Sequence, residues 1–110
     1  MKQTGTNKLE SNFQEEVIKY LESKGAYVLK THVSSFQKQG EPDITCCYQG
    51  RYLAFELKKD GKSKTSKLQD YKIKQIILAG GIAKRVDNIK QIEEVLYEIS
   101  RVQQSSQSNG

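Results

Sequence analysis

Two strand-like runs separated by a two-residue connection constrain this chain more than any other feature of its sequence. DITCCY (43–48) and RYLAFELK (51–58) are rich in β-branched, aromatic and apolar residues, and only Gln49-Gly50 lies between them. Such a pattern predicts an antiparallel hairpin. With the turn centred on Gln49-Gly50, paired residue numbers sum to 99, and one face of the hairpin collects Ile44, Cys46, Leu53, Phe55 and Leu57. We expect this face to lie in the core.

The other face of the predicted hairpin carries ionisable side chains. Asp43 lies opposite Glu56 in this register, with Cβ atoms roughly 4.5–5.5 Å apart, and Lys58 points the same way. Two opposed carboxylates destabilise a sheet, and partial burial strengthens their repulsion. A divalent cation such as Mg²⁺ or Mn²⁺ would remove that cost, because hard oxygen ligands suit these ions. Lys58 could also neutralise part of the charge without a metal; the geometry favours the metal site.

The rest of the chain predicts three helices and two further strands. Apolar residues recur at helical spacing in 9–24, which ends before Gly25, and in a segment from Ser66 to Gly80-Gly81. Strands are expected at 26–32, before a loop that leads to Pro42, and at 82–86. Asp87 or Asn88 can cap a third helix, and the tail 103–110 is expected to be disordered. The order α-β-β-β-α-β-α predicts an α/β domain over 1–102, with a mixed β-sheet flanked by helices on both faces.

The charge of the chain is concentrated in one segment. The chain has 110 residues and a formal net charge of +5, and the segment 58–74 accounts for all of this excess, with seven lysines against Asp60 and Asp70. Such a cluster is typical of a surface that binds a phosphate backbone, although a solvated lysine-rich loop and helix face would have the same composition.

Composition also restricts the compartment and the metal chemistry. No run of apolar residues approaches the length of a membrane span, and MKQTGTNKLE lacks the apolar centre of a signal peptide, so we expect a soluble cytoplasmic protein. Cys46 and Cys47 are adjacent and would point to opposite faces of a strand. With a single histidine in the chain, the sequence predicts reduced cysteines and no zinc site.

Several blocks of the sequence together resemble a known nuclease family. Pro42-Asp43 followed by Glu56-Leu57-Lys58 is similar to the PD-(D/E)XK nuclease motif, and the context resembles the virus-type replication-repair nuclease (VRR-NUC) branch. The similarity extends from about Glu10 to Val86. It includes GEPDI, the FELK strand, the lysine-rich loop, SKLQ at the start of a helix, and the AGG before the fourth strand. The ordered set of blocks is more specific than the short motif alone.

The resemblance implies a restriction-endonuclease-like core and assigns roles to individual residues. Asp43 and Glu56 correspond to metal-binding carboxylates, the backbone carbonyl of Leu57 to a further ligand, and Lys58 to the lysine that positions or activates the attacking water. Glu10 matches the first-helix glutamate, which would bind the metal directly or through water, and its spacing to Phe13 and Val17 predicts an inward orientation. Glu15 and Glu16 are fallback candidates, for which a surface role is favoured.

The roles of two sets of residues have alternative interpretations. Gln69 matches a glutamine of the family's second helix, but Ser66-x-x-Gln69 is also a capping box, in which the glutamine accepts from a backbone N–H. The predicted DNA-binding residues are Lys59, Lys62, Lys64, Lys67, Lys72 and Lys74, for which solvent exposure alone is the alternative.

The resemblance therefore implies an Mg²⁺- or Mn²⁺-dependent deoxyribonuclease. The expected substrate is branched, flapped or junction DNA, and a homodimer would be needed for symmetric cutting of a junction, because this chain offers one active site. Similarity to small phage replication and recombination nucleases suggests a bacterial or phage-infected cell. The alternative is a nucleic-acid-binding module of the same fold that does no chemistry.

Overall fold

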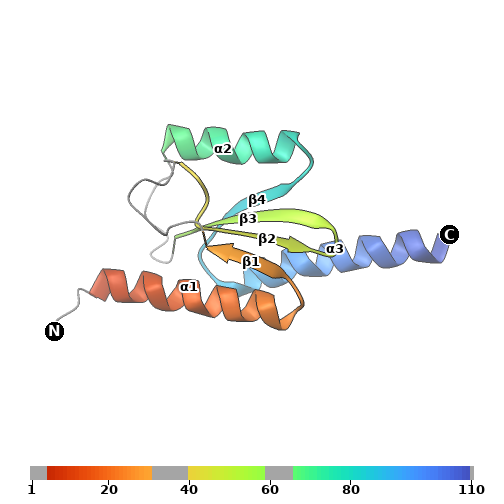
Figure 1. Ribbon diagram of the computed structural model, residues 1–110, viewed down its shortest axis with the longest axis horizontal. Helices are drawn as coiled ribbons and strands as arrows, with labels where there is room; N and C mark the ends of the chain where they lie inside the picture. Colours follow the sequence, from red (N-terminus) through yellow and green to blue (C-terminus); the bar gives the residue numbers. More distant parts are fainter. Residues whose placement is uncertain (1–4, 31–39, 59–65, 110) are drawn as a thin grey trace.

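The computed structural model describes residues 5–30, 40–58 and 66–109, with side chains described for 12–30, 40–58 and 66–103. Within these ranges the order of elements is α-β-β-β-α-β-α, which confirms the predicted order (Figure 1). The elements are α1 (Gly5–Ser23), β1 (Tyr27–Lys30), β2 (Ile44–Tyr48), β3 (Arg51–Leu57), α2 (Lys67–Leu78), β4 (Ile82–Val86) and α3 (Ile89–Asn109).

The strands form one mixed sheet in the order β1-β2-β3-β4. β1, β2 and β3 pair antiparallel, whereas β4 pairs parallel with β3. A parallel neighbour requires a crossover connection, and α2 supplies it between β3 and β4. The mixed sheet flanked by helices is therefore confirmed.

The hairpin of β2 and β3 has the predicted register. Ile44 pairs with Phe55 and Tyr48 with Arg51, so that every pair in the ladder sums to 99. Gln49 and Gly50 both have positive φ angles, 49° and 82°, as a type I′ turn requires. The right-handed twist of this turn matches the twist of the two strands and holds the register on which the site depends.

One face of the sheet forms the hydrophobic core with α1 and α3. All five predicted core residues of the hairpin are buried on this face, and Phe13, Val17 and Leu21 of α1 cover them together with apolar residues of α3. Their spacing at i, i+4 and i+8 explains why α1 presents one apolar stripe to the sheet. Each fully buried side chain of this size contributes about 1.5–3 kcal/mol relative to an exposed one.

Among the helices of the described residues, α2 covers the opposite face and lies on the other side of the sheet from α1 and α3 (Figure 1). Thr45, Ala54 and Glu56 are buried on this face, and α2 packs against β4, although no described residue of α2 is itself buried. Towards the other edge, Tyr27 and Leu29 of β1 are 72% and 55% exposed. Within the described residues, this face therefore has a buried carboxylate near α2 and exposed apolar side chains on β1.

The boundaries of several elements differ from the sequence prediction, and α1 begins at Gly5 rather than at residue 9. β2 begins at Ile44, so Asp43 precedes the strand rather than lying in it. Residues 31–39, including the predicted end of the first strand, lie outside the described residues. α3 continues to Asn109 through most of the tail for which composition predicted disorder, and Gln103 Nε2 donates to the carbonyl of Gln49 at 2.9 Å. This contact joins the helix to the hairpin turn. It is a long-range interaction, which cannot be predicted from composition.

No helix in the described part of the chain has the length and apolar character needed to cross a membrane.

Candidate functional site

Asp43 lies where the ladder between β2 and β3 ends. Leu57 would pair with residue 42 if the register continued, but the last pair of the ladder is Ile44 with Phe55. The Asp43 carboxylate replaces a backbone carbonyl as the acceptor, because its Oδ2 accepts a hydrogen bond from the N–H of Leu57 at 2.9 Å. Pro42, which is fully buried, has no N–H to donate to a ladder. The carboxylate is therefore bound to the strand that carries Glu56.

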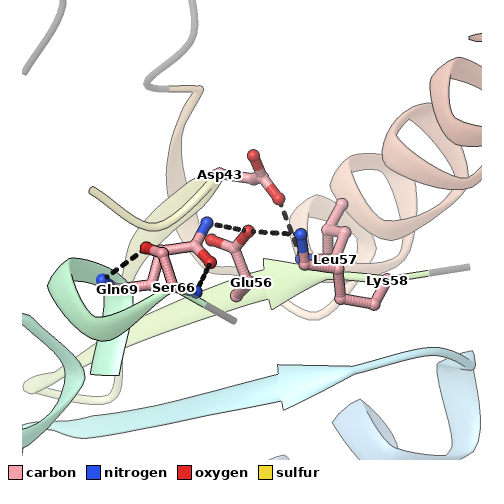
Figure 2. A network of polar contacts seen from close by, with 6 residues as sticks. All are labelled: Asp43, Glu56, Leu57, Lys58, Ser66 and Gln69. Atoms are coloured by element: carbon pink, nitrogen blue, oxygen red, sulfur yellow. Dashed lines mark hydrogen bonds and ion pairs between the residues drawn. The ribbon is translucent and has the colours of Figure 1, made fainter. Parts of the chain in front are cut away.

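Glu56 is a buried carboxylate with two polar partners on the same oxygen. Its residue is 3% exposed, and its Oε2 accepts a hydrogen bond from Gln69 Nε2 at 2.7 Å and lies 3.4 Å from Lys58 Nζ. A buried carboxylate requires such partners, since an uncompensated charge in the interior costs several kcal/mol. Figure 2 shows that β3 carries Glu56, that Lys58 directly follows the end of this strand, that α2 supplies Gln69, and that Asp43 approaches from the segment before β2.

Gln69 performs both of the functions that its sequence allows. As the third residue of α2 it accepts the N–H of Ser66 at its Oε1 (3.0 Å), while its own N–H donates to Ser66 Oγ (3.1 Å). Its Nε2 simultaneously donates to Glu56 (Figure 2). The two interpretations are therefore compatible, because the amide has an acceptor for the cap and a donor for the carboxylate.

The segment before Asp43 is held against the start of α2. Gly40 has a φ of 83°, and a Cβ at this position would lie 2.5 Å from Leu68 Cγ, so only glycine fits without a shift of the Leu68 side chain. Glu41 forms an ion pair with Lys72 at 3.1 Å. These contacts couple the position of Asp43 to the helix that carries Gln69.

The donor set fits a hard divalent cation. Asp43 and Glu56 place two carboxylates at this end of the hairpin. Among the residues with described side chains, no group of three or more Asp, Glu, His or Cys side chains could hold a metal. Two carboxylates are sufficient for Mg²⁺, which keeps several waters and is completed by substrate phosphates. The Leu57 carbonyl, predicted as a further ligand, belongs to the residue whose N–H binds Asp43.

The structure unites four predicted site residues, namely Asp43, Glu56, Lys58 and Gln69. Glu10 lies in α1, but its side chain is outside the described part. The fallback candidates Glu15 and Glu16 are exposed.

The predicted DNA-binding lysines divide into three groups. Lys59, Lys62 and Lys64 lie outside the described residues. Lys67 and Lys74 are exposed on α2. Lys72 is the partner of Glu41, so part of its charge is already compensated by this chain.

Three residues near the site were not singled out by sequence reasoning. Arg85, Asp87 and Gln91 line a cavity together with Lys58. Arg85 lies beside Glu56 through the parallel pairing of β3 and β4. The register of a parallel pair joined by a helix leaves no signal in the sequence comparable with a two-residue hairpin turn, and so the sequence did not indicate this neighbour.

The comparisons with known proteins agree with this geometry. The family model described as "Archaeal holliday junction resolvase (hjc)" matches residues 6–84, which include all four of the clustered site residues. The chain belongs to the Hjc family. This membership confirms the predicted relation to PD-(D/E)XK nucleases and identifies the chain as a nuclease-family protein.

A solved structure supports the fold of this Hjc-family chain. It is titled "VRR_NUC domain", is 24% identical, and aligns with a TM-score of 0.66 over 80% of this chain and 94% of its own. No curated protein sequence matches the chain at a comparable level. The structural likeness confirms the restriction-endonuclease-like core that the VRR-NUC resemblance implied.

Proposed function

We propose that this Hjc-family protein is an Mg²⁺- or Mn²⁺-dependent DNA endonuclease that hydrolyses phosphodiester bonds of branched DNA. The observation that carries this proposal is the convergence of Asp43, Glu56 and Lys58 at one end of the β2–β3 hairpin. Oδ2 of Asp43 is bound to Leu57 at 2.9 Å, and Lys58 Nζ lies 3.4 Å from Glu56.

Each residue of the site would have a different role in hydrolysis. Asp43 and Glu56 would hold the cation, with the Leu57 carbonyl and Glu10 as further ligands. When bound, the cation supplies charge neutralisation at the phosphate and promotes ionisation of water. Lys58, whose side chain is 19% exposed, can reach solvent while Glu56 holds it in place, so its ammonium can orient a water or contact a phosphate oxygen. Gln69 restrains the Glu56 carboxylate from the opposite side.

The expected substrate follows from the family and from charge. The matched family is described as a Holliday junction resolvase, and the exposed Lys67 and Lys74 lie on α2, the helix that supplies Gln69. Lysines bind the phosphate backbone without reading bases, which suits selection by DNA shape rather than by sequence.

Symmetric cutting of a four-way junction requires two active sites, and we expect a homodimer for this reason. Tyr27, Leu29 and Tyr52 are exposed on the half of the sheet face that α2 leaves open, with Tyr52 at 49%. An uncharged apolar surface of this kind is compatible with pairing to its own copy, whereas a lysine cluster would repel its copy. Light scattering on the purified chain measures its oligomeric state directly.

The test compares cleavage of a four-way junction, a flap, a linear duplex and a single strand in Mg²⁺ or Mn²⁺. Lys58→Ala is the active-site variant, and Lys19→Ala is its matched control, because Lys19 is an exposed lysine of α1 outside the predicted DNA-binding set. We expect junction cleavage by the wild type, a loss of about 10²–10⁴-fold in Lys58→Ala, and a change of less than about threefold in Lys19→Ala.

Cleavage of similar rate by wild type and Lys58→Ala would rule out this assignment of the site. Binding of junction DNA by the wild type without cleavage in either metal would instead support the alternative, a nucleic-acid-binding module of the same fold.

A further inference from the structure

The polar cavity that Arg85 lines lies beside the cluster of Asp43, Glu56 and Lys58. It has a volume of about 120 Å³, and its lining residues are Lys58, Arg85, Val86, Asp87 and Gln91. One water molecule needs about 10–15 Å³ on the same measure, so a space of this size has room for a phosphate group. Lys58 belongs both to this cavity and to the ion pair with Glu56.

The pairing of β4 with β3 places Arg85 on the face of the candidate site. Arg85 is the Cα partner of Glu56 in the parallel ladder, so both side chains project from the same face of the sheet. Neighbouring strands lie about 4.8 Å apart, which puts Arg85 one strand spacing from the buried carboxylate. Lys84, the preceding residue, projects from the opposite face by alternation.

Arg85 is exposed, and no hydrogen bond or ion pair joins its guanidinium to any residue within 12–30, 40–58 or 66–103. Asp87, the acidic residue of the cavity, accepts a hydrogen bond from Asn88 Nδ2 at its Oδ1, at 3.0 Å. Lys58 is paired with Glu56, so Arg85 is the cation of this cavity that has no carboxylate partner among these described side chains.

Gln91 adds a neutral donor to the same cavity. Its Oε1 already accepts the backbone N–H groups of Asp87 (2.6 Å) and Asn88 (3.2 Å). The amide Nε2 of Gln91 therefore remains to bind a ligand, and it can only donate hydrogen bonds. The cavity thus combines an ammonium, a guanidinium and an amide donor, the groups that bind phosphate oxygens.

We propose that this cavity is a phosphate subsite, in which Arg85 binds a backbone phosphate of the DNA strand next to the phosphate that is cleaved. The subsite rests on the proposed nuclease function, because it places that strand relative to Asp43 and Glu56. A guanidinium binds a phosphate through two parallel hydrogen bonds, so Arg85 fixes both the position and the orientation of the strand. Arg85 is accordingly a substrate-binding residue, with an effect on affinity rather than on the chemical step.

The test measures binding of a labelled four-way junction by fluorescence anisotropy in EDTA, at salt concentrations between about 50 and 200 mM. The variants are Arg85→Ala, Arg85→Lys and the matched control Lys84→Ala, which removes one charge from the adjacent position of β4 on the opposite face. Thermal unfolding of each variant verifies that it is folded.

We expect Arg85→Ala to weaken binding about tenfold and to reduce the slope of log K against log salt by about 1, the value for one phosphate contact. Lys84→Ala should change the affinity less than twofold. Arg85→Lys should keep the salt slope of the wild type with an intermediate affinity, because the charge remains and the second hydrogen bond is lost. In Mg²⁺, Arg85→Ala should raise KM and leave kcat within about twofold.

Equal effects of Arg85→Ala and Lys84→Ala on affinity and salt slope would overturn the subsite, even if the wild type cleaves junctions. A wild type that binds junctions but does not cleave them would overturn the nuclease proposal, and the binding data would still decide the subsite. A loss of affinity in Arg85→Ala that Arg85→Lys does not restore in any part, with an unchanged salt slope, would also contradict it.

Discussion

Gln69 donates a hydrogen bond from its Nε2 to Oε2 of Glu56, at 2.7 Å, from the first turn of α2 to the buried end of β3. The same side chain completes the capping box with Ser66. The start of the helix and the orientation of the carboxylate are therefore controlled by one residue, and a change at Gln69 affects both.

Substitution at Ser66 and Gln69 separates the cap from the carboxylate contact. Ser66→Ala removes the hydroxyl acceptor of the cap and should lower the free energy of unfolding by about 0.5–2 kcal/mol, with cleavage largely retained. Gln69→Ala also removes the donor to Glu56, a hydrogen bond to a charged group worth about 1.5–3 kcal/mol, and should reduce cleavage at least tenfold. Urea unfolding and single-turnover cleavage of both variants measure the two effects. Equal cleavage by the two variants would show that Gln69 acts only as a cap.

Divalent cations should stabilise the folded protein through Asp43 and Glu56. A ligand that binds only the folded state at 100 times its dissociation constant adds about 2.7 kcal/mol of stability. The melting temperature of the wild type should therefore rise with Mn²⁺ or Mg²⁺, and that of Asp43→Asn or Glu56→Gln should not.

Both variants keep an oxygen that can accept the hydrogen bond from Leu57 or Gln69, so the comparison isolates the loss of charge. Glu94→Gln, at an exposed position of α3, is the control and should respond like the wild type. Stabilisation of Asp43→Asn equal to that of the wild type would place the cation elsewhere.

Gly40 should tolerate a side chain less well than Gly50, although both have similar positive φ angles of 83° and 82°. A Cβ at Gly50 would meet nothing within 4 Å, so Gly50→Ala reports the backbone strain alone, about 1–2 kcal/mol. Gly40→Ala adds a contact of 2.5 Å with Leu68 and should cost about 1–3 kcal/mol more. It should also reduce cleavage, because Leu68 lies next to Gln69. Differential scanning calorimetry of the two variants gives the difference, and equal losses of stability would contradict the close approach to α2.

The two adjacent cysteines should differ in reactivity. Burial, together with the neighbouring Cys47, raises the pKa of the Cys46 thiol to about 11, and Cys46 is 4% exposed, whereas Cys47 is exposed. The thiolate is the reactive form, so iodoacetamide at a pH of about 8 should modify Cys47 and leave Cys46 intact until the protein is unfolded. Peptide mass spectrometry identifies the modified residue, with Cys47→Ser as the control. Rapid modification of Cys46 in the folded wild type would show that the core face of β2 is open.

The hairpin illustrates how far local patterns predict a structure. The alternation of apolar residues in 44–57 and the short Gln49-Gly50 connection predict the register, because a slip of one residue would turn every side chain to the wrong face. The capping box at Ser66 and strand β4 were predicted for the same reason, since each depends on residues close together in the chain. The position of Asp43 was less accurate. The sequence predicted that Asp43 lies within the strand. In the structure the strand begins at Ile44, and the Asp43 carboxylate accepts a hydrogen bond from the N–H of Leu57.

The sequence by itself determined the order of elements, the hairpin register and the convergence of Asp43, Glu56 and Lys58, because period-2 and period-3.6 patterns and turn residues act over a few positions. Only the tertiary structure decided that Gln69 reaches Glu56, that Lys72 pairs with Glu41, and that Arg85 lies beside the site. These contacts join β3, α2, β4 and the segment before β2. They depend on how α2 crosses the sheet to bring β4 parallel to β3, and this packing is set by the whole core rather than by any short stretch of sequence.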